Sequence, residues 1–209
     1  MGPPDYGLQF DTDRYNEFCR NGTFGQLLKI HGSLNWLYCD KCQRLDLYVS
    51  RGMRTGKALD ELYNDAYSRR GTPCRNEPDC DGFISPIMIT PTFIKDYENP
   101  HIKRVWSEAE AAMKSATRAV SVGYSLPTDD VEISLLFKRG LGHLRQDRIT
   151  VIEYVRGEES KPKTERTSLE NHDVGRRYQT LFGKGIDWHT TGFEGWLLEQ
   201  ESQNRFPFL

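Results

Sequence analysis

The sequence predicts an α/β fold, with a parallel sheet covered by helices and a small module held by four cysteines. From residue 83 onward, short apolar runs that suit strands alternate with longer stretches that suit helices. Residues 39–80 are instead polar and dotted with glycine, and cysteines occur at both ends of this segment. A segment with so few large aliphatic residues cannot build a core of its own, so we expect a staple.

Apolar periodicity and helix-start signals locate the individual elements. Strands are expected at 27–36, 83–89, 119–122, 149–155 and 186–189. Helices are expected at 57–67, 100–116, from 129 onward, 168–182 and 192–200. Asn99-Pro100 is typical of a helix start, and Asp129 with Glu132 has the spacing of a capping box. Residues 156–167 are charged, and we expect a mobile loop there.

The predicted domain organisation has three parts. Residues 1–26 form an irregular N-terminal segment, and residues 27–38 join residues 81–209 in the α/β domain. Residues 39–80 form a zinc-binding module inserted into that domain.

The composition indicates a soluble, cytoplasmic protein. The 209 residues are 37% hydrophobic and 28% charged. No run approaches the roughly 18 apolar residues that cross a membrane, and the N-terminus does not resemble a signal peptide. The formal net charge of -2 provides no general attraction to nucleic acid.

Four of the five cysteines follow the pattern C-x2-C-x31-C-x5-C. They are Cys39, Cys42, Cys74 and Cys80. In a reducing cytosol such thiols are more often metal ligands than disulfides. Four thiolates complete a tetrahedral zinc site and leave no open position, so the predicted Zn2+ is structural. The alternative is four unrelated thiols that are buried as small hydrophobic groups. Cys19 lies outside the set, and we assign it no role.

A histidine follows the first predicted strand, in the sequence His31-Gly32-Ser33. Imidazole can accept a proton near neutral pH, and the glycine would let the backbone approach a ligand. A purely structural histidine at the end of a strand is the alternative.

A second candidate segment is the turn Gly123-Tyr124-Ser125, between a buried strand and a helix. This is where α/β folds bind nucleotides. The two carboxylates of Asp129 and Asp130 would disfavour a phosphate placed directly on the helix start.

Taken together, these motifs resemble the sirtuin family, and within it the bacterial sirtuin-like branch. The segment K-I-H-G-S-L-N-W at 29–36 leads into the first cysteine pair. The segments S-P-I-M-I-T-P-T-F-I-K at 85–95 and V-G-Y-S-L-P-T-D-D at 122–130 follow in the order of the family. The resemblance covers residues 28–155 and implies a partial Rossmann-like sheet, a zinc module and NAD as substrate.

The resemblance also implies roles for individual residues. His31 would be the general base that acts on the nicotinamide-side ribose of NAD. The implied NAD-binding residues are Gly32, Ser33, Gly123, Tyr124 and Ser125. Pro91 and Lys95 would face the acceptor cleft.

The sequence departs from the family in its first part. It contains neither the glycine-rich G-A-G-x-S loop that cradles the NAD phosphates nor a T-Q-N or N-Y-D motif before the H-G pair. Glu153 stands where the family often has an asparagine. The chain therefore resembles the C-terminal portion of a sirtuin-like protein.

Three functions are compatible with this resemblance. NAD+ hydrolysis is favoured, because the two main motifs are similar to those of bacterial NAD hydrolases of anti-phage defence. NAD-dependent protein deacylation is the second reading. The third is a non-catalytic, zinc-stabilised binding module, whose partner would be the missing N-terminal half, another chain or a second copy.

Overall fold

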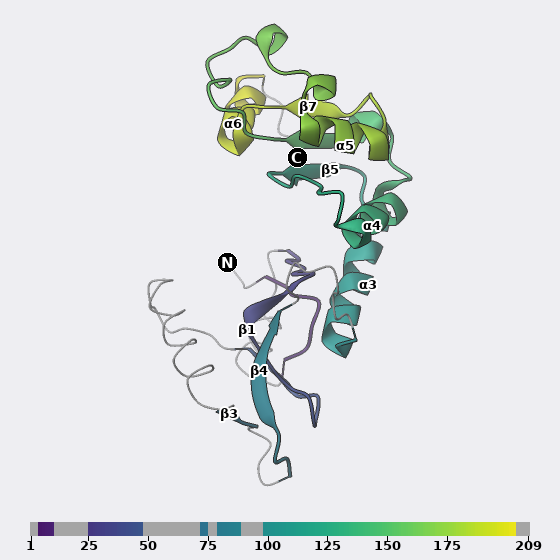
Figure 1. Cartoon of the computed structure of the whole chain (residues 1–209), viewed down its shortest axis with the longest axis vertical. Helices are drawn as coiled ribbons and strands as arrows, with labels where there is room; N and C mark the ends of the chain where they lie inside the picture. Colours follow the sequence, from purple (N-terminus) through teal and green to yellow (C-terminus); the bar gives the residue numbers. More distant parts are fainter. Residues whose placement is uncertain (1–3, 11–24, 48–71, 75–78, 89–97, 204–209) are drawn as a thin grey trace. The chain divides into compact units, whose positions relative to one another are not determined.

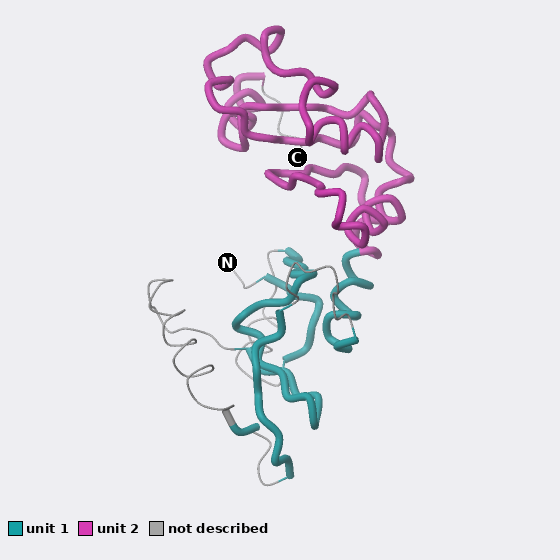
Figure 2. Tube along the Cα trace, viewed as in Figure 1, with its two compact units in different colours: residues 1–109 teal, residues 110–209 magenta. Residues whose placement is uncertain are grey.

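The computed structural model describes residues 4–10, 25–47, 72–74, 79–88 and 98–203 (Figure 1). The chain divides into two compact units, Met1–Ala109 and Glu110–Leu209 (Figure 2). The boundary falls within helix α3 (Pro100–Ser115). In the described part of the chain, no helix is both long and apolar enough to span a membrane.

The first unit contains an antiparallel four-stranded sheet in the order β2-β1-β4-β3. Its strands are β1 (Gly32–Cys39), β2 (Leu45–Leu47), β3 (Thr72–Pro73) and β4 (Phe83–Met88). The register of β1 against β4 shifts between Ser33 and Leu37, so the middle of β1 is irregular. The sheet therefore brings the ends of β1 and β3 and the start of β4 into one region.

This topology corrects two expectations. The strand expected at 27–36 begins only at Gly32, because the backbone N–H of Gly32 closes a turn onto the Lys29 carbonyl (2.8 Å). The strand expected at 83–89 exists as β4, but it pairs with β1 and does not join the parallel sheet. An apolar run indicates a buried strand without identifying its partner. The predicted domain division stays a prediction, and the helix expected at 57–67 lies outside the described residues.

The core of the first unit draws on the N-terminal segment as well as on the sheet and α3. Its buried members are Leu8, Phe10, Trp36, Leu45, Leu47, Ile87, Ile102 and Val105. Tyr6 and Phe10 both approach Trp36 edge-on, with ring centroids 5.8 and 6.0 Å away. An irregular segment thus supplies aromatic packing to the strand that follows the histidine.

The second unit contains a parallel sheet in the order β5-β6-β7 with helices around it. Its strands are β5 (Ala119–Val122), β6 (Ile149–Ile152) and β7 (Asp187–His189). Its helices are α4 (Val131–Leu141), η1 (Gln146–Arg148), η2 (Lys163–Glu165), η3 (Leu169–Asn171), α5 (Asp173–Phe182) and α6 (Gly192–Ser202). All four residues of β6 are buried, as expected for a parallel strand covered on both faces. The predicted α/β class, with a parallel sheet flanked by helices, is confirmed.

The helix starts agree with the sequence at α3 and differ at α4. The Asn99 side-chain oxygen accepts hydrogen bonds from the backbone N–H groups of His101 (2.9 Å) and Ile102 (3.3 Å), as an N-cap does. The predicted capping box at Asp129 is wrong, because Asp130 occupies the N-cap position and makes no side-chain cap bond. Its carboxylate instead accepts a 2.5 Å hydrogen bond from the Tyr124 hydroxyl.

The loop at 156–167 is anchored, which differs from the mobile loop expected. Glu158 is only 2% exposed and accepts hydrogen bonds from the Thr167 backbone N–H (3.0 Å) and hydroxyl (2.6 Å). Arg166 donates to the Glu199 carboxylate of α6 (2.5 Å). A glutamate in a charged run is normally solvated, so the composition of the loop did not reveal this buried anchor.

Candidate functional site

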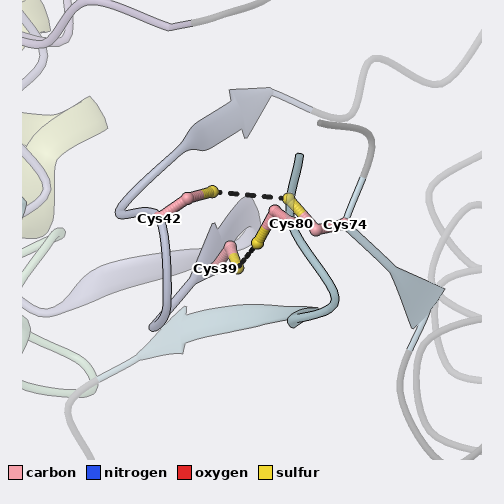
Figure 3. Close-up of side chains that lie close together, drawn as sticks. All are labelled: Cys39, Cys42, Cys74 and Cys80. Carbon is pink, nitrogen blue, oxygen red and sulfur yellow. Dashed lines mark hydrogen bonds between the residues drawn. The ribbon is translucent and has the colours of Figure 1, made fainter. Parts of the chain in front are cut away.

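The four predicted metal ligands lie together in the first unit (Figure 3). Cys39 ends β1, Cys42 lies in the turn that follows, Cys74 follows β3 and Cys80 precedes β4. The four sulfur atoms lie within 4.8 Å of one another, with 3.8 Å between Cys39 and Cys80 and 3.5 Å between Cys42 and Cys74.

These distances fit a metal ion better than they fit disulfides. A tetrahedral zinc ion with Zn–S bonds of about 2.3 Å places its sulfurs about 3.8 Å apart. A disulfide needs a separation of about 2.05 Å, and all four cysteines are free. The cluster could therefore hold Zn2+ as a closed four-thiolate site.

Backbone N–H groups around the cluster favour thiolates. The N–H groups of Cys42 and Lys41 lower the pKa of the Cys39 thiol to about 7, although burial acts in the opposite direction. The Gly82 N–H donates to the Cys80 sulfur (3.4 Å). At Cys80 the Gly82 N–H lowers the pKa, but burial and the neighbouring Cys42 and Cys39 thiols outweigh it and raise the pKa of that thiol. Metals bind the thiolate form, so the donors favour an ion at Cys39.

Gly82 leaves room for the sulfurs. A Cβ atom at this position would lie 2.6 Å from the Cys39 sulfur and 3.2 Å from the Cys80 sulfur. Both distances are below normal contact, so a side chain at residue 82 would displace the ligands.

The His31 imidazole has a buried nitrogen without a partner. His31 sits in the turn between Lys29 and Gly32 and is half-buried. Its Nε2 atom is buried and has no hydrogen-bond partner among the described residues. Buried polar atoms are normally paired, and the described residues include two further histidine nitrogens of this kind, in His172 and His189.

Gly32 is required by packing. A Cβ atom at this position would lie 2.3 Å from the Ile87 carbonyl oxygen and 3.3 Å from the Cδ1 atom of Ile102, and φ is +78°. The glycine therefore allows β1 and β4 to approach each other. Its predicted contact with NAD stays a prediction.

Ser33 belongs to a chain of hydrogen bonds that spans the histidine turn. The Lys29 ammonium donates to the Ser33 hydroxyl (2.9 Å), and that hydroxyl donates to the Asn35 side-chain oxygen (2.6 Å). Burial lowers the pKa of Lys29, and its ammonium lies 5.3 Å from the centre of the Tyr6 ring. Ser33 thus braces the turn, and its role toward NAD is not tested by this geometry.

The turn Gly123-Tyr124-Ser125 leaves the carboxyl end of β5 in the second unit. The Gly123 N–H donates to the Ile152 carbonyl at the end of β6 (3.0 Å). Gly123 has φ +62°, and no atom of the described residues lies within 4 Å of the position that its Cβ would occupy. In open parallel sheets, ligands bind at this edge.

Two side chains of α5 donate hydrogen bonds to backbone carbonyls of this turn. The Tyr178 hydroxyl donates to the Tyr124 carbonyl (3.0 Å), and the Arg177 guanidinium donates to the Ser125 carbonyl (2.7 Å). Burial, followed by the carboxylate of Asp130, raises the pKa of Tyr124 far above its ordinary value. Burial also raises the pKa of Tyr178 to about 12, so both phenols stay neutral. The Ser125 side chain remains exposed.

Glu153 follows β6 at the same edge of the sheet. It is half-buried, and a side-chain oxygen accepts the N–H of Tyr154 (3.1 Å). Gly123 and Glu153 therefore lie on neighbouring strand ends, as a ribose-binding edge would require.

The predicted residues form two sets, one in each unit. His31, Gly32 and Ser33 share the first unit with the cysteines, and Gly123, Tyr124 and Ser125 lie in the second. Pro91 and Lys95 lie outside the described residues. The sequence analysis missed Trp106, whose indole N–H donates to the Ile30 carbonyl (2.7 Å), because an apolar position in a helix indicates only core. The available signal was that a tryptophan N–H usually needs a partner when it is buried.

Neither a protein-family model nor a curated protein matches the chain. Solved sirtuin structures do match it. A structure of a Sir2 enzyme, from work on mechanism and regulation, aligns with 90% of this chain and 58% of its own, at 15% identity and a TM-score of 0.41. A sirtuin studied for substrate affinity aligns with 97% and 69%, at 14% identity and a TM-score of 0.41.

A third matching structure is Sir2 in complex with the inhibitor EX-527, 2'-O-acetyl-ADP-ribose and a deacetylated p53 peptide. It aligns with 92% of this chain and 61% of its own, at 14% identity and a TM-score of 0.38. The chain thus spans 58% of the first of these sirtuins and 61% of the third. These solved structures are of the family that the motifs resemble, at 14–15% identity and TM-scores of 0.38 to 0.41.

Proposed function

We propose that this chain is the histidine- and zinc-bearing portion of a sirtuin-like enzyme that hydrolyses NAD+ to nicotinamide and ADP-ribose. The observation that carries the proposal is the buried, unpartnered Nε2 atom of His31. It occurs in an H-G turn that leads directly into a four-cysteine cluster. Among the described residues, His172 and His189 also carry a buried ring nitrogen without a partner, so the H-G turn and the adjacent cysteine cluster are what distinguish His31.

In the proposed reaction, His31 is the general base. The bond between nicotinamide and ribose breaks through an oxocarbenium-like state, and water supplies the hydroxyl that replaces nicotinamide. Nε2 accepts the proton released as the ribose–oxygen bond forms. The products balance as nicotinamide, ADP-ribose and one proton from NAD+ and water.

Zinc supplies structure in this proposal. Cys39, Cys42, Cys74 and Cys80 would hold Zn2+ with four thiolates, which leaves no position for substrate or water. The ion would tie the end of β1 to the start of β4, and β1 begins beside His31.

In the second unit, the candidate NAD-contacting residues lie at the carboxyl ends of β5 and β6. The absence of described atoms in front of Gly123 and the exposed side chain of Ser125 support a place for the ribose and phosphate, and the half-buried Glu153 supports a contact with ribose hydroxyls. Gly32 and Ser33 would border the nicotinamide side. We further propose that the protein works in the cytoplasm, where its thiols stay reduced, and serves anti-phage defence.

The test is nicotinamide release from NAD+. It is measured for the 209-residue chain and for the encoded protein with any residues that precede Met1. His31→Ala should lower the rate by about 100- to 10,000-fold, which is the usual contribution of a general base. His143→Ala is the matched control, because His143 is exposed in the second unit and bonds only the Ala116 carbonyl (2.9 Å) among the described residues.

Each outcome has a consequence for the proposal. Release by His31→Ala at the wild-type rate would overturn the role of His31. Release that requires an acyl-lysine peptide and yields acetyl-ADP-ribose would replace hydrolysis with deacylation. If calorimetry detects no NAD+ binding at millimolar concentration in either form, the chain is a binding module.

A further inference from the structure

The turn that carries His31 is fixed by a side chain from a distant helix. Trp106 lies half-buried on α3, and its indole Nε1–H donates a 2.7 Å hydrogen bond to the carbonyl oxygen of Ile30. The two residues are 76 positions apart, and both belong to the first unit. Trp106 also packs against the core cluster that contains Trp36.

The accepting carbonyl belongs to the peptide group that leads into His31. A peptide group is planar, so the Ile30 oxygen and the His31 nitrogen rotate together. A donor that fixes this oxygen therefore fixes the backbone at His31 and, with it, the direction of its Cα–Cβ bond. The other turn contact, from the Gly32 N–H to the Lys29 carbonyl (2.8 Å), does not involve that peptide group.

The remaining braces act on the neighbours of His31. Lys29 and Ser33 are joined across the turn by a 2.9 Å hydrogen bond, and Gly32 packs beneath the Ile87 carbonyl. These contacts hold the two ends of the turn in place. The central peptide group, between Ile30 and His31, is held by Trp106.

We propose that Trp106 is a positioning residue for His31. Its indole N–H orients the Ile30–His31 peptide group so that the unpartnered Nε2 atom is held in one direction. The catalytic consequence rests on the proposed function, whereas the effect on the turn does not. Trp106 acts through the backbone of His31 and needs no contact with NAD+.

Two tryptophan variants of the full chain provide the test. Trp106→Phe keeps an aromatic ring and removes the donor. Trp36→Phe is the matched control, because Trp36 belongs to the same core cluster and its buried Nε1 has no hydrogen-bond partner in the described part of the chain. NMR of the His31 ring and the Gly32 amide reports on the turn, and nicotinamide release reports on catalysis.

Trp106→Phe should shift the His31 and Gly32 signals, whereas Trp36→Phe should leave them in place. It should also lower kcat by about 10- to 100-fold with KM for NAD+ unchanged, as expected when a catalytic group is misplaced. In the wild-type protein, the indole proton of Trp106 should resonate downfield of that of Trp36, which tests the hydrogen bond without any variant.

Unshifted His31 and Gly32 signals in Trp106→Phe would overturn the positioning role, whatever the rates. Shifted signals with an unchanged kcat would overturn its catalytic consequence. If the signals shift in Trp106→Phe but the wild-type protein releases no nicotinamide, the positioning role is supported and the proposed function is rejected.

Discussion

The first and second units are stabilised in different ways. The first has a hydrophobic core around Trp36, but at the cysteine end the described residues add only Leu37 and Ile84 to the buried Cys39, Cys74 and Cys80. The second unit packs a fully buried strand, β6, against α5 through residues such as Val151 and Tyr178. The comparison indicates that the first unit needs a metal ion bound by its cysteines, whereas a hydrophobic core is sufficient to stabilise the second.

The same difference appears at the two candidate turns. Gly32 is a glycine because the Ile87 carbonyl occupies the space of a side chain. At Gly123 the backbone angle is the constraint, since no atom of the described residues occupies the space of a side chain. The first turn is thus built into the packing of its unit, and the second faces open space where a ligand can approach.

Metal removal should have the largest effect, and it should destabilise the first unit while leaving the second unit folded. A strong chelator, or Cys39→Ser combined with Cys74→Ser, should release about one zinc per chain and unfold the cysteine end of the first unit. Structural zinc sites contribute on the order of 10 kcal/mol of binding free energy, which is also folding free energy. Hydrogen exchange followed by mass spectrometry should show loss of protection in β1 and β4 and retained protection in β5 and β6.

Cys19→Ser is the control for that experiment, because Cys19 is the one cysteine outside the C-x2-C-x31-C-x5-C pattern. It should leave the zinc content unchanged. Equal loss of protection in both units on chelation would contradict the idea that bound metal stabilises the first unit and a hydrophobic core stabilises the second.

Gly32→Ala should destabilise the first unit by about 2–5 kcal/mol. The new Cβ would sit 2.3 Å from the Ile87 oxygen, and φ is +78°. Overpacking costs roughly 1–3 kcal/mol, and a strained backbone adds roughly 1–2 kcal/mol. Urea unfolding monitored in the first unit measures the change. A loss below that of Gly123→Ala would show that β1 and β4 can separate without much cost.

The sequence predicted the second unit well, because its elements carry local signals. The alternating apolar runs give β5, β6, α5, β7 and α6, and the Asn99-Pro100 pair gives the start of α3. The pairing of β1 with β4 was not predictable in this way. Both are apolar runs, and their antiparallel pairing joins segments more than 40 residues apart, which periodicity does not specify.

The candidate site was predictable where the spacing of residues in the sequence indicates a specific chemistry, such as metal binding. The pattern of Cys39, Cys42, Cys74 and Cys80 correctly anticipated a cluster of sulfurs. Single residues in tertiary contacts were missed. The sequence around Trp106 does not identify the carbonyl, 76 residues away, that accepts its hydrogen bond. Glu158 looked like one more charge in a polar loop, although it is 2% exposed.

Gly123→Ala should cost about 1–2 kcal/mol of stability and yet weaken NAD+ binding. No atom of the described residues lies near the added methyl group, so the cost is that of the left-handed backbone. Gly157→Ala is a close control, because Gly157 has φ +84° and equally open surroundings. Calorimetry should show weaker NAD+ binding for Gly123→Ala alone. Equal effects of the two variants would mean that the open space at Gly123 is not a ligand site.

Asp187→Asn should have the smallest effect, which is confined to acid stability of the second unit. Asp187 accepts hydrogen bonds from the buried His189 ring (2.9 Å) and the Thr150 hydroxyl (3.3 Å), and the bond to His189 is the main cause that lowers the pKa of Asp187. The folded-state pKa thus lies below the unfolded value of about 3.9. The stabilisation is fully present above that value and is lost as pH falls through the folded-state pKa. Because Asp187 is partly exposed, we expect it to contribute less than about 1 kcal/mol to the stability at neutral pH.

Urea unfolding between pH 2 and pH 7 should show that the stability of Asp187→Asn declines less steeply in acid than that of the wild type. Asp147→Asn, which removes an exposed ion pair with Arg145 (3.0 Å), should keep the wild-type slope. If both variants kept that slope, a carboxylate other than Asp187 would govern the acid stability of the second unit.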